Sequence, residues 1–212
     1  SVSSSPDGKW LAAGGYDSMV EIYDIDVLLQ VANSDPEGAS SLKPSKTLHF
    51  RAEAGPAFIW STSFSADGST FAVGSWNFHA HVYDVNDGLF TERVDLMRGD
   101  RVYAVALSAD GSRIVIGGRD GFVVMYSVSS APAHALWKVG AHTSVVDDGS
   151  RPDFVYTVAL GSRFCAFSGT SHVVQIVDAS TGDHLMRMDL GSTVNSLSIC
   201  GRYLCVLPNS TR

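Results

Sequence analysis

One pattern occurs three times in this sequence, each time in the same register. Every copy begins with Ser-x-Asp-Gly and reaches a Tyr-Asp or Tyr-Ser pair 18 residues later. The copies start at Ser5, Ser65 and Ser108, so they are 60 and then 43 residues apart. A pattern that keeps its spacing over about 20 residues marks a repeated structural unit, which limits the folds open to the chain.

Within each copy, short apolar segments alternate with turn residues. The clearest copy has apolar segments at 102–107, 112–117 and 122–128, separated by Asp110-Gly111 and by a glycine-rich corner. Asp-Gly reverses a chain at low steric cost, so we predict an antiparallel meander. A period near 43 is typical of the roughly 40–45 residues in a four-stranded propeller blade. The sequence therefore predicts an all-β propeller built of four-stranded antiparallel blades.

Two further units repeat the first apolar segment without the Asp-Gly turn. Val155–Leu160 matches Val102–Leu107, and Val194–Ile199 matches both. We therefore predict about four to five repeats, with units at approximately 1–58, 59–101, 102–152, 153–192 and 193–212. The first unit begins inside its first strand and the last stops after its second. We expect a propeller segment truncated at both ends, taken from a longer chain.

Two segments lengthen the repeat. In the first unit a polar tract at 33–41 precedes a strand predicted at 46–51, and we interpret the tract as a loop between the third and fourth strands. Residues 140–154 form an enlarged connection between the third and fourth units. Loops of this kind can carry function, although polar length alone is more typical of a solvated insertion.

Composition excludes several classes of partner. The net charge is −7, and the 15 Lys and Arg residues are dispersed, so we expect no nucleic-acid partner. No apolar run approaches the roughly 18 residues that a membrane span needs, so we expect no membrane association. Cys165, Cys200 and Cys205 lie in or beside apolar strand patterns, which favours buried thiols. An odd cysteine count fits a reducing compartment, and we expect a cytoplasmic, intracellular protein.

These motifs resemble the WD40-repeat family along essentially the whole chain. The resemblance lies in the Ser-x-Asp-Gly turns, in corners such as Gly117-Gly118-Arg119-Asp120, and in the closing Tyr-Asp pairs. The family's Trp-Asp pair has Tyr in place of Trp here, and its Gly-His pair is missing. In that family a corner Asp anchors a buried hydrogen-bond network. The matching positions, which we expect to act as structural turn residues, are Asp17, Asn77, Asp120 and Ser171.

The resemblance also implies two partner-binding positions on one face of the propeller. One is the start of each first strand, and the other precedes the corner Asp. Large aromatic and Arg side chains at these positions favour binding. The predicted partner-binding residues are Tyr16, Trp60, Trp76, Tyr103, Arg119 and Tyr156. Trp60, Tyr103 and Tyr156 are equally explained by packing between blades, whereas the turn position of Trp76 and Arg119 favours binding.

Catalytic and metal patterns are weak. His79 and His81 point to one side of a strand, but no third ligand follows at a recognisable spacing, so a polar strand face explains them better. We predict no catalytic residue, metal or cofactor. The expected function is a non-catalytic scaffold or adaptor that binds a protein or peptide, with Arg119 available to an acidic or phosphorylated group. The alternatives are a structural or regulatory propeller within a larger multidomain protein, and an enzyme that uses the channel or residues 140–154. The sequence leaves the oligomeric state open.

Overall fold

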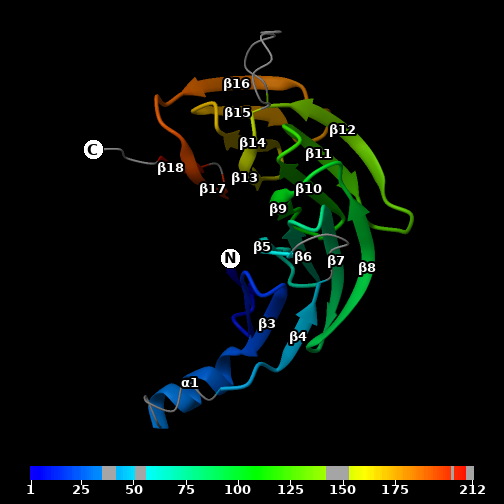
Figure 1. Cartoon of the computed structure of the whole chain (residues 1–212), viewed down its shortest axis with the longest axis vertical. Coiled ribbons are helices and arrows are strands. Elements are labelled where there is room, and N and C mark those ends of the chain that lie inside the picture. The colour runs from blue at the N-terminus through cyan, green and yellow to red at the C-terminus, as the bar shows by residue number, and fades with distance from the viewer. Residues whose placement is uncertain (35–41, 51–55, 142–152, 202, 209–212) are drawn as a thin grey trace.

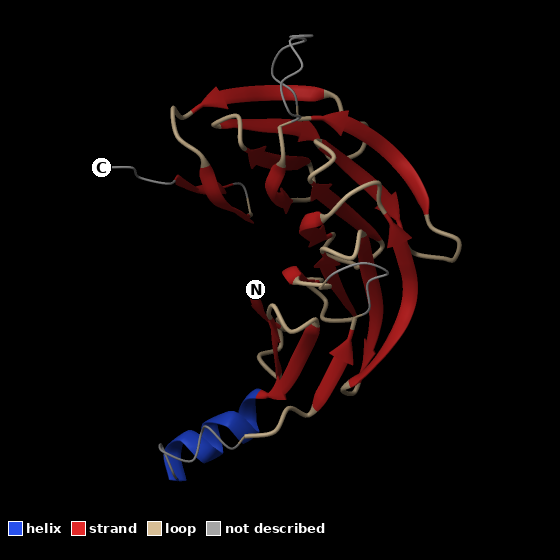
Figure 2. Cartoon of the chain, in the orientation of Figure 1, coloured by secondary structure: helices blue, strands red, loops and turns tan. Residues whose placement is uncertain are grey.

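Five antiparallel sheets follow one another along an open arc (Figures 1 and 2). This architecture comes from a computed structural model that describes residues 1–34, 42–50, 56–141, 153–201 and 203–208. Four sheets have four strands and the last has two, and a single helix occurs in the described part of the chain. The predicted all-β fold with four-stranded blades is confirmed.

The strands follow chain order within every sheet, and we call the sheets blades 1 to 5. Blade 1 contains β1 (Val2–Ser4), β2 (Trp10–Gly14), β3 (Met19–Asp24) and β4 (Lys46–His49). Blade 2 contains β5 (Ile59–Phe64), β6 (Thr70–Ser75), β7 (His79–Asn86) and β8 (Leu89–Met97). Blade 3 contains β9 (Val102–Leu107), β10 (Arg113–Gly118), β11 (Phe122–Ser127) and β12 (His134–Gly140). Blade 4 contains β13 (Val155–Leu160), β14 (Phe164–Gly169), β15 (Val173–Asp178) and β16 (His184–Asp189), and blade 5 contains β17 (Val194–Cys200) and β18 (Tyr203–Pro208).

The Ser-x-Asp-Gly turns share one hydrogen-bond pattern. In blade 3 the Ser108 hydroxyl donates to Asp110 Oδ1 at 2.6 Å, and Asp110 Oδ1 also accepts the Ser112 backbone N–H at 3.1 Å. The Ser108 hydroxyl oxygen accepts the Arg113 N–H at 2.9 Å. Gly111 has φ 63°, a left-handed conformation that glycine adopts at little cost. The motif therefore joins the first two strands through its own side chains.

This turn makes stability depend on pH. Hydrogen bonds from the hydroxyls of Ser108 and Ser112 lower the pKa of Asp110 to about 2. An unfolded aspartate titrates near pH ~3.9, so the ionised carboxylate contributes stability above that pH and loses it as pH falls towards about 2. We expect Asp110→Asn to reduce the slope of the unfolding free energy between about pH 4 and pH 2. Urea denaturation at several pH values measures this, and equal slopes in wild type and variant would contradict it.

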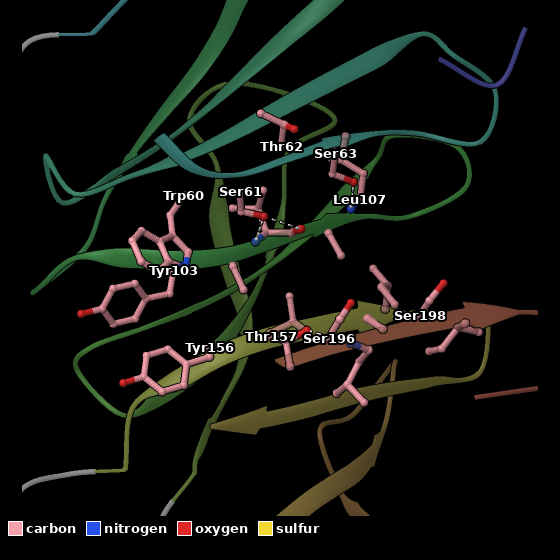
Figure 3. A pocket seen from close by; sticks show the side chains of 18 of the residues that line it. Trp60, Ser61, Thr62, Ser63, Tyr103, Leu107, Tyr156, Thr157, Ser196 and Ser198 are labelled. Carbon is pink, nitrogen blue, oxygen red and sulfur yellow. Dashed lines mark hydrogen bonds between the residues drawn. The ribbon is translucent and has the colours of Figure 1, made fainter. Parts of the chain in front are cut away.

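Adjacent blades pack through apolar side chains and through hydroxyl groups on their innermost strands. Between blades 1 and 2 the buried cluster includes Ile22, Phe71 and Phe90, and similar clusters fill the later junctions. Near the start of the inner strands, a hydroxyl oxygen just before β1 and at the third residue of β5 and of β13 accepts a backbone N–H from the next blade. The bonds are Ser1 to Thr62 at 3.0 Å, Ser61 to Val105 at 3.1 Å and Thr157 to Leu197 at 3.0 Å. The inner strands thus hold a fixed spacing around a shared cavity of about 560 Å³ (Figure 3).

The connection between β3 and β4 differs from the expected loop. Its first part is helix α1 (Ile25–Ser34), which projects from blade 1, while residues 35–41 lie outside the described part (Figure 2). Asp24 closes the Tyr-Asp pair and also caps the helix, since its Oδ1 accepts the N–H groups of Asp26 at 2.9 Å and Val27 at 3.3 Å. The sequence did not predict this helix, and the first two residues of the polar tract at 33–41 lie in its last turn, while the rest of the tract lies outside the described residues.

The cysteines agree only in part with the expectation of buried thiols. Cys165 is free and fully buried, and burial raises the pKa of its thiol to about 12. Cys205 is also free but exposed, because it lies on β18 in the two-stranded blade 5. In the described ranges, no helix has the length and apolar character needed to cross a membrane.

Candidate functional site

The predicted partner-binding residues meet at one end of the inner strands. Trp60, Tyr103 and Tyr156 stand side by side at the starts of β5, β9 and β13 (Figure 3). The Tyr103 ring lies 5.5 Å from the Trp60 ring and 5.4 Å from the Tyr156 ring, measured between centroids. The repeated register thus turns residues far apart in sequence into a continuous row.

The corner residues extend this row outwards. Trp76, at the β6–β7 corner, stacks on Trp60 with centroids 5.2 Å apart and an interplanar angle of 18°. Tyr16, at the β2–β3 corner, meets Trp60 edge-on at 6.5 Å. Aromatic side chains from blades 1 to 4 therefore form one surface, which we call the aromatic face. Its members are Tyr16, Phe58, Trp60, Trp76, Tyr103, Phe154 and Tyr156.

The exposed fraction of each side chain distinguishes partner binding from packing between blades, the two roles that the sequence left open. Tyr103 is only 7% exposed, so its main role is packing between neighbouring rings. Tyr16 is 69% exposed and Trp60 37% exposed, which leaves ring surface available to a partner. Trp76 and Tyr156 are half-buried, and burial raises the pKa of Tyr156. Trp76 thus packs within the face instead of standing free at a turn.

A third position on this face escaped the sequence analysis. The residue immediately before each of the inner strands β5, β9, β13 and β17 occupies this position, and these residues are Phe58, Arg101, Phe154 and Thr193. Their backbones are tied to the corners, since the N–H groups of Trp76 and Arg119 donate to the carbonyls of Phe58 and Arg101, both at 2.9 Å. Thr170 N–H donates to the Phe154 carbonyl at 3.1 Å. Their constant place two residues before the aligned positions of Trp60, Tyr103 and Tyr156 is the signal that could have found them.

Both cations of the face belong to blade 3. The Arg101 guanidinium lies 4.3 Å from the centre of the Trp76 ring in blade 2. The Arg119 guanidinium lies 5.5 Å from the centre of the Phe154 ring, next to blade 4. Neither arginine forms a salt bridge with any residue that the structure describes. Stacking on an aromatic ring fixes a guanidinium while leaving its in-plane N–H donors open to an anion.

A pocket of about 540 Å³ opens between the blades at this face. It is lined by Trp60, Trp76, Tyr103, Tyr156, Thr193, Val194 and Asn195. The Trp76 indole Nε1 is buried and has no hydrogen-bond partner among the described residues. Pockets lined by aromatic side chains with a few polar groups are typical of ligand sites. The face therefore offers both a flat aromatic surface and a concave part.

The predicted turn residues lie at the corners behind this face. Asp17, Asn77 and Asp120 each accept a backbone N–H two residues later through Oδ1, at 3.1–3.2 Å. Ser171 makes no comparable bond within the described residues. Asp120 does more than stabilise its own turn, because Arg98 Nη2 donates to its Oδ2 at 2.7 Å. Arg98 comes from the connection between blades 2 and 3, so this corner joins two structural elements that the sequence analysis treated separately.

The two histidines singled out in the sequence lie on β7, beside the carboxylates of β8. His79 Nδ1 is 2.6 Å from Asp95 Oδ1, and His81 Nδ1 is 2.7 Å from Glu92 Oε1. Where side chains are described, no group of three or more His, Cys, Asp or Glu residues could hold a metal ion. Of the 140–154 connection, residues 142–152 lie outside the described part.

Comparisons with known proteins agree on the family. A profile of the family described as WD domain, G-beta repeat, matches residues 1–24, 43–84 and 94–127. These segments cover the three complete copies of the repeat, and the chain belongs to the WD40-repeat family. Propellers of this family in general act as scaffolds for protein interactions and are typically non-catalytic.

Two curated relatives share part of the sequence. WD repeat-containing protein 26 homolog of Drosophila melanogaster is 30% identical over 119 residues, which is 55% of this chain and 17% of the relative. WD repeat-containing protein 1 of Gallus gallus is 30% identical over 128 residues, 60% of this chain and 18% of the relative. The chain thus spans less than a fifth of either protein.

A solved structure covers almost the whole chain. A chain in the crystal structure of the mitotic checkpoint complex superposes with a TM-score of 0.73 and 20% sequence identity. The match includes 99% of this chain and 57% of that one. At this identity the likeness shows the shared propeller fold alone.

Proposed function

We propose that this chain is a protein-binding scaffold, acting as an adaptor, whose aromatic face holds a peptide segment of a partner. The observation that carries the proposal is the row of contacting aromatic rings across four blades, open to solvent at Tyr16 and Trp60. Large, rigid aromatic side chains bury much area at a small entropy cost and dominate binding energy at interfaces. The free thiols of Cys165 and Cys205 support an intracellular location.

The face suits an extended segment better than a compact small molecule. Its members lie at successive strand starts and corners, so the binding surface follows the blades one after another. The pocket beside Trp60 and Tyr156 can take one anchoring side chain of such a segment. A peptide that follows the row would therefore meet flat rings along its length and one deeper site.

Removing the stacked tryptophans tests this proposal. We expect wild-type protein to enrich a set of peptides from a random phage-displayed library. The Trp60→Ala/Trp76→Ala variant should bind those peptides with an affinity about tenfold lower or weaker still, because buried aromatic anchors contribute about 2 kcal/mol or more. Fluorescence polarisation with the enriched peptides measures the loss. The matched control is Leu185→Ala, which removes an apolar side chain that is 58% exposed on β16, away from the face.

The control must bind like wild type, and circular dichroism must show that the double variant is folded. Unchanged peptide affinity in the folded double variant would place the binding surface elsewhere.

A further inference from the structure

We infer that the segment held by the aromatic face is acidic, with an anionic side chain beside blade 3 and an apolar anchor beside blade 2. This inference rests on the proposed peptide-binding function and specifies its ligand. It starts from the unequal chemistry of the blades at this face, where blade 2 presents three aromatic rings and blade 3 presents two arginines around a buried tyrosine.

The blade 2 side is apolar. Phe58, Trp60 and Trp76 contact one another, with ring centroids of Phe58 and Trp76 5.1 Å apart and those of Trp60 and Trp76 5.2 Å apart. Trp60 keeps 37% of its surface exposed beside the pocket. An aromatic or aliphatic side chain of a partner would bury this surface. The apolar anchor of the ligand is therefore expected here.

The blade 3 side is cationic, and its cations are held in place. Arg101 lies on Trp76 and Arg119 on Phe154, so the two guanidinium groups flank Tyr103 from opposite sides. Their backbones are joined by the Arg119 N–H bond to the Arg101 carbonyl. Because both side chains are half-buried against rings, little rotamer entropy remains to be lost when an anion binds.

Asp100 and Asp153 directly precede Arg101 and Phe154 in the sequence, and both carboxylates have hydrogen bonds of their own. Asp100 Oδ1 accepts the Arg101 backbone N–H at 2.8 Å. Asp153 Oδ1 accepts the Thr170 hydroxyl at 3.2 Å. Neither forms a salt bridge with a described arginine. With respect to the described residues, the guanidinium donors are thus open to an anion from a partner.

The overall charge of the chain makes this local arrangement selective. A net charge of −7 repels acidic peptides at long range, so such a peptide gains affinity only through contacts that reach the arginines. Within a Debye length of about 8–10 Å, charge-assisted hydrogen bonds from a guanidinium are strong and can be bidentate. A carboxylate or a phosphorylated side chain supplies the same anionic chemistry.

Charge changes on both partners test the inference. We expect peptides enriched on wild type to carry an excess of Asp and Glu, and the Arg101→Gln/Arg119→Gln variant to bind them about tenfold or more weakly, as expected for lost hydrogen bonds to a charged group. Changing the acidic residue of the best peptide to its amide should cause a similar loss on wild type and little further loss on the variant. Arg163→Gln removes an exposed arginine of blade 4 and should leave binding unchanged.

Further measurements distinguish a carboxylate from a phosphorylated side chain, and distinguish failure of this inference from failure of the proposed peptide binding. Tighter binding of the same peptide with phosphoserine at the acidic position would identify a phosphorylated partner, and weaker binding would identify a carboxylate. Neutral or basic enriched peptides, or equal binding by the arginine variant, would overturn the inference and leave the peptide-binding function intact. Failure of wild type to enrich any peptide beyond the Trp60→Ala/Trp76→Ala variant would overturn both.

Discussion

Gly111→Ala is expected to destabilise the protein by about 2–5 kcal/mol. Gly111 has φ 63°, and a left-handed backbone costs an alanine about 1–2 kcal/mol. A Cβ there would also lie 2.1 Å from Thr70 Oγ1 and 2.6 Å from Thr70 Cβ, and Thr70 is fully buried. Overpacking of this kind typically costs about 1–3 kcal/mol. Urea denaturation followed by circular dichroism measures the loss.

The repeat itself supplies the matched control. Gly8 occupies the same place in the first Ser-x-Asp-Gly turn and has φ 73°, but a Cβ there would meet nothing within 4 Å. Gly8→Ala should therefore show only the backbone cost, about 1–2 kcal/mol. Equal losses for Gly8→Ala and Gly111→Ala would show that the contact with Thr70 in blade 2 does not constrain the turn of blade 3.

Arg98→Met is expected to destabilise the protein by about 2–4 kcal/mol, because it leaves a largely buried carboxylate without its cation. The side chains of Arg98 and Asp120 are 5% and 20% exposed, and Nη2 lies 2.7 Å from Oδ2. Arg98 Nη1 also donates to the Tyr126 hydroxyl at 3.3 Å. The exposed Arg163→Met should change stability by less than about 0.5 kcal/mol.

A double-mutant cycle isolates the ion pair from the lost packing of Arg98. Asn77 accepts the turn N–H at the equivalent corner of blade 2, so Asp120→Asn should keep the turn while it removes the charge. The combined variant should then lose less stability than the sum of the two single variants. Strict additivity in urea denaturation would mean that the pair contributes no coupling energy.

The candidate site could be predicted from the sequence because propeller strands are in register. Once Val102–Leu107 is aligned with its counterparts, Trp60, Tyr103 and Tyr156 must stand at equivalent strand starts, and the structure places them side by side. Exposure could not be predicted in this way. Tyr103 is nearly buried and Trp60 is not, since burial depends on rings contributed by neighbouring blades.

The missed features are contacts between segments that share no motif. Arg98 reaches Asp120 across a blade connection, and Arg101 reaches Trp76 across a blade boundary. Helix α1 was not predicted because Asp24 has two roles: it closes a repeat and also caps the helix. The repeat pattern within one unit cannot predict contacts of this kind, because each contact includes a residue outside the shared motif.

The blades, their turns and the order of the strands can be predicted from the sequence, because they depend on hydrogen bonds and apolar alternation within about 40 residues of chain. The three-dimensional packing of the blades is needed to show which aromatic rings remain exposed, where Arg101 and Arg119 lie and what Asp120 binds. Those properties depend on distances between atoms of different blades, which the packing of the inner strands sets.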